Sequence, residues 1–264
     1  MKIRAKRTPV KITRAVLFAL MLREIRGKFG SNRLGAFWFL FEPLGQLVLM
    51  LSIFSLIRAP VVHGVPLLQF LANGIVPFVL FKNIALTGMQ AVNANRGLFA
   101  YRQIQAIDMI FARTLVECVL MAVVYALVLF SLSMWVNVPF AISDPLHWLL
   151  ALSVGVFLSF SLAVLFCIFI AYFPELSNLI RMAYLPLYLI SGVIFPISVL
   201  PDRFLSSLLW NPYLHIIEIL RGSSIPYYRV LHQANLTYPA TVAVVLLFCA
   251  LGAYRINKER LVAA

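Results

Sequence analysis

Long apolar runs recur along this chain, and they constrain its fold more than any other feature. Runs of about eighteen or more nearly uncharged residues are each long enough to cross a hydrocarbon layer of about 30 Å. Since 62% of the 264 residues are hydrophobic and 12% are charged, one soluble core could not cover so much apolar surface. The runs are continuous rather than alternating, so they favour helices over a membrane barrel.

The runs predict an all-α integral membrane protein with six transmembrane helices. We expect spans near residues 36–58, 66–92, 107–136, 146–173, 179–200 and 236–256. Residues 1–35 would form a basic N-terminal segment, and residues 36–264 a single six-span transmembrane domain.

The N-terminal segment predicts an amphipathic helix that lies in the membrane interface. Phe18, Leu22, Ile25 and Phe29 are four, three and four residues apart, which places them on one stripe of a helix. The many Lys and Arg of this segment would then contact lipid headgroups.

The distribution of basic residues predicts the orientation. The net charge is +13, and 17 of the 22 Lys and Arg fall in segments that are cytoplasmic if the N-terminus is inside. Cytoplasmic loops carry this excess in membrane proteins, so we expect both termini in the cytoplasm. Because the basic residues flank the spans, they indicate contact with membrane lipid and no nucleic-acid partner.

The outer segment 201–235 is long and apolar, which predicts more than a simple connection. Pro201 and Asp202 would open a short helix, and a break followed by a second helix would complete an outer helical hairpin before the last span. The hairpin would be re-entrant or interfacial. Its candidate functional residues are Asn211, Pro212, His215, Glu218 and Arg221.

Charged residues inside predicted spans are costly unless they are paired or hydrated. Lys82 and Glu117 lie at a similar depth, about 15 Å from the cytoplasmic side. One hypothesis is that they form an intramembrane ion pair, and the other is that each is separately hydrated or reaches the interface. Arg113, four residues before Glu117, is a competing partner. Glu42 either lines a channel entrance or is an interfacial acid.

Signs of enzymatic chemistry are absent from the sequence. No phosphate-binding loop of the form G-x-x-x-x-G-K-[ST] occurs, and the four histidines have no metal-ligand spacing. The three cysteines fall inside apolar runs and predict neither a disulfide framework nor a metal site. We therefore expect no catalytic residue, metal or cofactor in this chain.

Two blocks of residues resemble one family. The first contains Leu22-Arg23-Glu24, Lys28-Phe29-Gly30, Leu34-Gly35, Trp38 and Glu42-Pro43-Leu44, and the second contains Ser191 to Pro196, Leu200-Pro201, Trp210-Asn211-Pro212, His215, Glu218 and Arg221. Both are similar to bacterial capsular polysaccharide export permeases. These permeases are the membrane subunits of ATP-binding-cassette exporters.

The resemblance implies a homodimer in the bacterial inner membrane, joined to two copies of a separate ATPase that binds ATP and Mg²⁺. It also implies periplasmic and outer-membrane export components, and a first cytoplasmic loop, residues 93–106, that couples to the ATPase. The coupling residues would be Arg23, Glu24, Asn95, Arg96, Tyr101 and Arg102.

Aromatic residues on spans that resemble channel-lining spans are candidates for contact with sugar. They are Phe37, Trp38, Phe41, Tyr184 and Tyr188. The function expected from the resemblance is export of lipid-linked capsular polysaccharide. The same architecture could instead carry O-antigen, teichoic acid or a small drug. An integral-membrane enzyme acting on lipid-linked sugars and a membrane scaffold are further alternatives.

Overall fold

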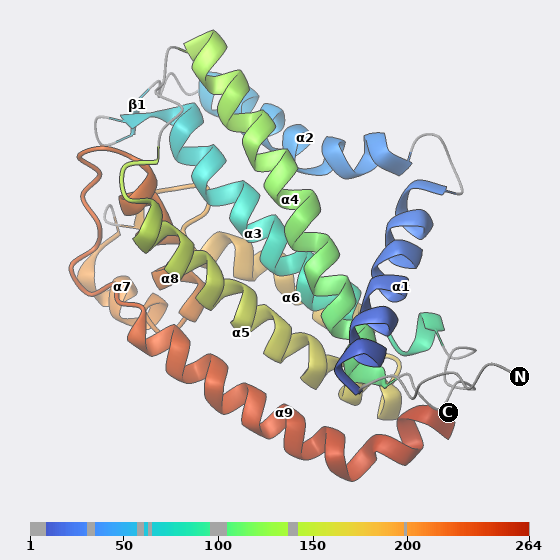
Figure 1. Ribbon diagram of the computed structural model, residues 1–264. Coiled ribbons are helices and arrows are strands. Elements are labelled where there is room, and N and C mark those ends of the chain that lie inside the picture. Colours follow the sequence, from blue (N-terminus) through green and yellow to red (C-terminus); the bar gives the residue numbers. More distant parts are fainter. Residues whose placement is uncertain are drawn as a thin grey trace, which may run out of the picture.

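The structure is a computed structural model, and it describes residues 9–30, 35–56, 61–62, 65–95, 105–136, 142–197 and 200–263. Within these residues the chain is almost entirely helical (Figure 1). The helices are α1 (Pro9–Gly30), α2 (Gly35–Leu56), α3 (Leu67–Met89), α4 (Ala106–Val136), α5 (Pro145–Tyr172), α6 (Leu176–Ile190), α7 (Asp202–Leu208), α8 (Pro212–Ser224) and α9 (Thr237–Ala263). Strands β1 (Val61–Val62) and β2 (Val65–Pro66) pair antiparallel between α2 and α3.

Within the described residues, four helices contain segments that are long and apolar enough to cross a membrane. The segments are Leu67–Met89, Ala106–Ser131, Pro145–Tyr172 and Thr237–Asn257. The apolar part of α2, Phe41–Phe54, is shorter, and so is α6. With 15 residues, α6 covers about 22 Å of an apolar layer about 30 Å thick. The structure thus gives four clear candidate spans for the six predicted from the sequence.

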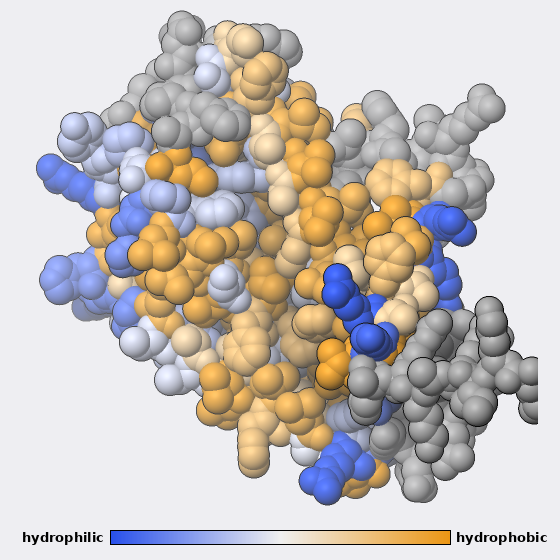
Figure 2. Space-filling view, in the orientation of Figure 1, coloured by the Kyte–Doolittle hydropathy of each residue, from blue (hydrophilic) through white to orange (hydrophobic). Residues whose placement is uncertain are grey.

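Helix α3 lies at the centre of the bundle. Helices α2, α4, α5 and α8 pack around it, and most of its side chains are buried (Figure 1). Helix α9 packs along α5 at the side of the bundle away from α3. Figure 2 shows apolar side chains across the middle of one face, with hydrophilic residues gathered toward two opposite sides. An exposed apolar belt between polar ends is the surface that a protein presents to a lipid bilayer.

Helix α1 packs on α4 through a different face from the predicted apolar stripe. Leu20 is buried against α4, whereas Phe18, Leu22 and Phe29 are exposed. The stripe is therefore not the packing face and remains open to lipid.

Two short helices, α7 and α8, occupy the segment that was predicted to form an outer hairpin. Asn211 caps α8, because its side chain accepts a hydrogen bond from the backbone N–H of Tyr213, and Pro212 occupies the first turn. Helix α8 packs against α3, α5 and α9, and its polar residues are as buried as its apolar ones. His215, Glu218 and Arg221 are all buried against protein.

Candidate functional site

A groove of about 700 Å³ lies between α2, α3 and α6. Helix α2 contributes Phe41, Glu42 and Gln46, helix α3 contributes Phe78 and Lys82, and helix α6 contributes Arg181, Tyr184 and Tyr188 to its lining. Sequence positions more than 130 residues apart thus meet at one surface, which we call the groove. Three of the five aromatic residues predicted to contact sugar line it, namely Phe41, Tyr184 and Tyr188.

The aromatic rings of the groove form a packed wall. Phe78 makes edge contacts with Tyr184 and Tyr188, at ring-centroid distances of 6.4 and 5.3 Å. The phenyl ring of Phe41 is 49% exposed, so it can stack on a ligand. Phe37 and Trp38 belong to α2, but their side chains lie outside the described residues.

Among the described residues, three that line the groove, Gln46, Tyr184 and Tyr188, carry a polar atom that is buried without a hydrogen-bond partner. These atoms are Gln46 Oε1 and the hydroxyl oxygens of the two tyrosines. A buried polar group without a partner is costly, and in native proteins it often indicates a ligand, a water molecule or a functional role. The groove therefore offers aromatic faces beside unused hydrogen-bonding groups.

The predicted ion pair between Lys82 and Glu117 is wrong, because each residue pairs with a different partner. Lys82 Nζ lies 2.5 Å from Glu42 Oε1, so the pair joins α3 to α2 at the groove. Glu117 Oε1 instead lies 2.5 Å from Lys28 Nζ of α1. The sequence places the two residues at a similar depth in the membrane. Their side chains nevertheless point in different directions around their helix axes and meet different helices. Glu42 thus lines the groove.

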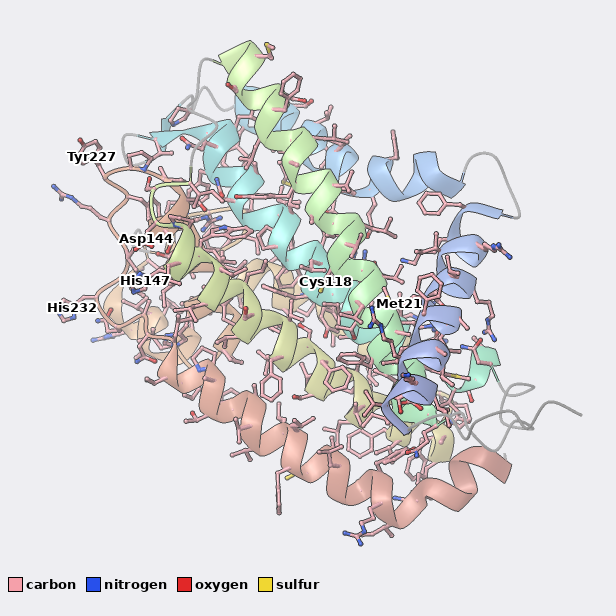
Figure 3. All side chains as sticks on the ribbon, viewed as in Figure 1. Met21, Cys118, Asp144, His147, Tyr227 and His232 are labelled. Atoms are coloured by element: carbon pink, nitrogen blue, oxygen red, sulfur yellow. The ribbon has the colours of Figure 1, made fainter. Side chains whose placement is uncertain are left out.

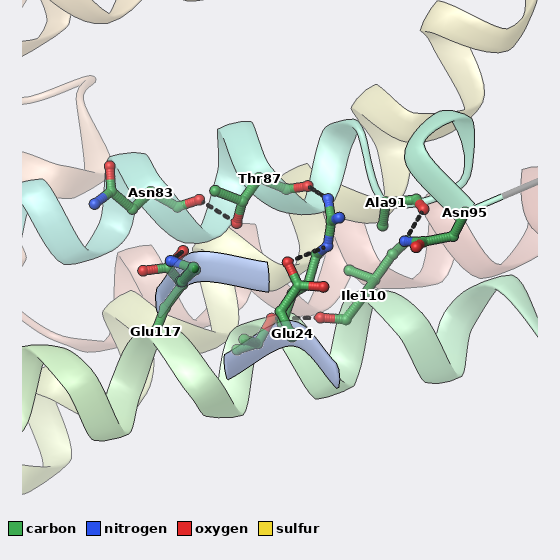
Figure 4. A network of polar contacts seen from close by, with 10 residues as sticks. Glu24, Asn83, Thr87, Ala91, Asn95, Ile110 and Glu117 are labelled. Atoms are coloured by element: carbon green, nitrogen blue, oxygen red, sulfur yellow. Dashed lines mark hydrogen bonds and ion pairs between the residues drawn. The ribbon is translucent and has the colours of Figure 1, made fainter. Parts of the chain in front are cut away.

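Arg113, considered as a partner of Glu117, pairs with Glu24. Arg113 Nε lies 2.9 Å from Glu24 Oε1 of α1, and Arg113 Nη1 donates to the Thr87 carbonyl near the end of α3 at 2.6 Å. Figure 4 shows Glu24, Thr87 and Glu117 in this network. The sequence reasoning missed both pairs with α1. The sequence does contain one signal for these pairs. The charged residues at positions 24 and 28 are four residues apart, and so are those at positions 113 and 117.

The predicted coupling segment 93–106 is only partly described. Asn95 is buried in a short turn after α3, and its side-chain amide donates to the Ala91 carbonyl at 2.7 Å. Arg96, Tyr101 and Arg102 lie outside the described residues. On α1, Arg23 is exposed, whereas Glu24 is engaged with Arg113.

The residues predicted for the outer hairpin make several buried polar contacts. The Asn211 side chain donates to Ser191 Oγ, and His215 Nε2 lies 2.8 Å from the Leu209 carbonyl. Arg221 is fully buried, 3.6 Å from Glu218, and donates to three backbone carbonyls. These contacts join α3, the turn after α6 and α8.

The His, Cys, Asp and Glu side chains of the described segments form no metal-binding cluster, because no three of them are close enough to hold a metal ion. Asp144 and His147 lie together at the start of α5, whereas His232 belongs to the loop before α9 (Figure 3). The backbone N–H of His147 and its side chain lower the pKa of Asp144 by hydrogen bonding, as at an ordinary helix cap.

Comparisons with known proteins agree with this architecture. The sequence profile of the ABC-2 type transporter family matches residues 15–225. The polysialic acid transport protein KpsM of Escherichia coli is 35% identical over 254 residues, which cover 96% of this chain and 97% of KpsM.

Two further relatives are more distant. The capsule polysaccharide export inner-membrane protein CtrC of Neisseria meningitidis is 26% identical over 224 residues, 83% of each chain. The capsule polysaccharide export inner-membrane protein BexB of Haemophilus influenzae is 26% identical over 208 residues, 78% of this chain and 77% of BexB. The family profile and the near full-length similarity to KpsM show that this chain belongs to the ABC-2 type transporter family.

Proposed function

We propose that this chain is the membrane subunit of an ATP-driven exporter that moves lipid-linked capsular polysaccharide across the bacterial inner membrane. Its membership of the ABC-2 type transporter family and its similarity to the polysaccharide transport and export proteins KpsM, CtrC and BexB support this proposal. The sequence lacks a phosphate-binding loop, so a separate ATPase would bind ATP and Mg²⁺.

The groove is the observation that carries the proposal. Sugar rings present C–H faces that stack on aromatic rings, together with hydroxyl groups that need hydrogen-bond partners. The groove supplies the rings of Phe41 and Tyr188 and the unpartnered polar atoms of Gln46 and Tyr188. A surface with few fixed hydrogen bonds also lets a polymer slide.

In this proposal two copies of the chain face each other across their grooves and enclose one channel. Helices α2 and α6 complete the six spans, both termini are cytoplasmic, and two ATPase copies bind from the cytoplasm. The segment 93–106 and α1 would transmit the motion of the ATPase, and α7 and α8 would shape the outer exit. Periplasmic and outer-membrane components would carry the polymer onward.

Deletion of the gene in a capsulated host tests the function. We expect surface capsule to disappear and capsular polymer to accumulate in the cytoplasm, while O-antigen stays at its normal level. Unchanged capsule without internal polymer would contradict the proposal. Loss of O-antigen with unchanged capsule would indicate that the exporter carries O-antigen instead.

Complementation of the deletion strain tests the role of the groove. We expect Tyr188→Leu, which removes a lining ring and its hydroxyl, to restore less surface capsule than the wild-type chain. Phe248→Leu is the matched control, because Phe248 lies on α9 and is 80% exposed. If both variants restored the same amount of surface capsule at equal protein level, the groove would not be part of the transport path.

A further inference from the structure

Two ion pairs join α1 to α4, and their polarity is crossed. Helix α1 supplies the acid of the first pair, Glu24–Arg113, and the base of the second, Lys28–Glu117. The partners are 2.9 and 2.5 Å apart, and the members of each helix are four residues apart. We call this arrangement the ion-pair ladder.

The crossed polarity fixes the register of α1 on α4. Four residues are about one turn, or about 6 Å along a helix. A shift of α1 by one turn would place Glu24 against Glu117 or Lys28 against Arg113, and like charges repel. Helix α1 therefore cannot slide along α4 by one turn without breaking both pairs.

Burial strengthens the ladder. The side chain of Glu117 is 1% exposed, and those of Arg113 and Glu24 are 12% and 18% exposed. Salt and water screen partly buried charges much less than exposed ones. The ladder thus differs from the exposed charges of the same helix, such as Arg14.

Arg113 extends the ladder to α3. Its Nη1 donates to the Thr87 carbonyl in the last turn of α3, where a cation also interacts favourably with the helix dipole. Leu20 of α1, Ala91 and Val92 after α3, and Ile110 of α4 share one apolar cluster beside it. Arg113 of α4 therefore contacts α3 as well as α1, and α3 and α4 border the predicted coupling segment 93–106. Figure 4 shows its two partners, Glu24 and Thr87.

From this geometry we infer that the ion-pair ladder is the link that makes α1, α3 and α4 move as one body, so that its charges set how much polymer is exported per ATP hydrolysed. The inference rests on the proposed function, because it concerns the same exporter. Arg113 is the central positioning residue, since it belongs to α4 and contacts both α1 and α3.

Export and ATP hydrolysis, measured for the complex with its ATPase, test the inference. Glu24→Gln keeps the side-chain shape at a partly exposed position, so the complex should assemble and hydrolyse ATP. We expect the amount of polymer exported per ATP hydrolysed to fall at least about fivefold. Coupling between two sites in a protein typically changes affinity by about this factor or more. Arg14→Gln, an exposed position on the same helix, is the control and should keep the wild-type ratio.

A charge swap tests the pairing itself. Lys28→Glu and Glu117→Lys should each lower export per ATP, and the double variant should return it to within about twofold of wild type. An unchanged ratio in an assembled Glu24→Gln complex would overturn the inference. So would an assembled double variant that stays as defective as the single variants. If the wild-type complex exports no polymer at all, the proposed function fails rather than the ladder.

Discussion

At the scale of single residues, Arg221 shows how a charge is held inside this protein. Its guanidinium is fully buried, donates to the carbonyls of Phe70, Gly192 and Val193, and lies 3.6 Å above the Phe70 ring. Glu218 lies 3.6 Å away and accepts a further bond from Tyr228. A planar guanidinium can make these contacts together, whereas an ammonium group cannot.

We predict that Arg221→Met destabilises the protein by about 3–5 kcal/mol, because Glu218 would stay buried without its cation. The melting temperature of the purified complex in detergent measures the change. Arg229→Met is the matched control, since Arg229 is exposed, and it should melt with the wild type. Equal melting of all three proteins would show that the buried network contributes little.

The residue scale is also where the sequence is least informative. The sequence analysis singled out Arg221 as a candidate. It could not predict the three backbone carbonyls that accept hydrogen bonds from Arg221, because a backbone carbonyl is present in every residue type. It placed Lys82 and Glu117 at one depth, but pairing depends on the rotation of each helix, and apolar runs do not specify that rotation. The correct partners, Glu42 and Lys28, are known only once the helices are packed.

At the scale of helices, close packing depends on small residues. Gly155 of α5 lies against Phe81 of α3, and an added Cβ would be 2.2 Å from Phe81 Cζ. Gly88 of α3 approaches Ala163 of α5 in the same way, with an added Cβ at 2.7 Å. Small residues let membrane helices approach closely, so α3 can be enclosed by its neighbours.

We predict that Gly155→Ala destabilises the protein by about 1–3 kcal/mol through overpacking against Phe81. Gly252→Ala is the control on α9, because nothing lies within 4 Å of an added Cβ there. Alanine is the better helix former, so the control should gain about 0.5–1 kcal/mol. Thermal unfolding in detergent distinguishes the two, and equal effects would contradict the packing account.

The positions of most helices could be predicted, because the start and length of each apolar run can be read directly from the sequence. The predicted span 66–92 corresponds to α3 (Leu67–Met89), and 146–173 corresponds to α5 (Pro145–Tyr172). The prediction was wrong at 179–200, because α6 ends at Ile190. Gly192 follows with a φ of +68°, a left-handed conformation that ends the helix and turns the chain toward α7.

At the scale of the whole molecule, the groove and the ion-pair ladder both include contacts with the central helix α3. Lys82 of α3 meets Glu42 in the groove, and the end of α3 meets Arg113 of the ladder. One rigid helix thus connects the surface proposed to contact polymer with the surface proposed to receive motion. This arrangement makes a mechanical account of export possible without any chemical step in this chain.

Photo-crosslinking during active export tests the central claim most directly. A benzophenone side chain at position 188 would sit in the groove, and one at position 248 would sit on the exposed face of α9. The account predicts that capsular polymer becomes attached at 188, only when the ATPase is active, and not at 248. Attachment at 248 with none at 188, or equal attachment at both positions, would contradict it.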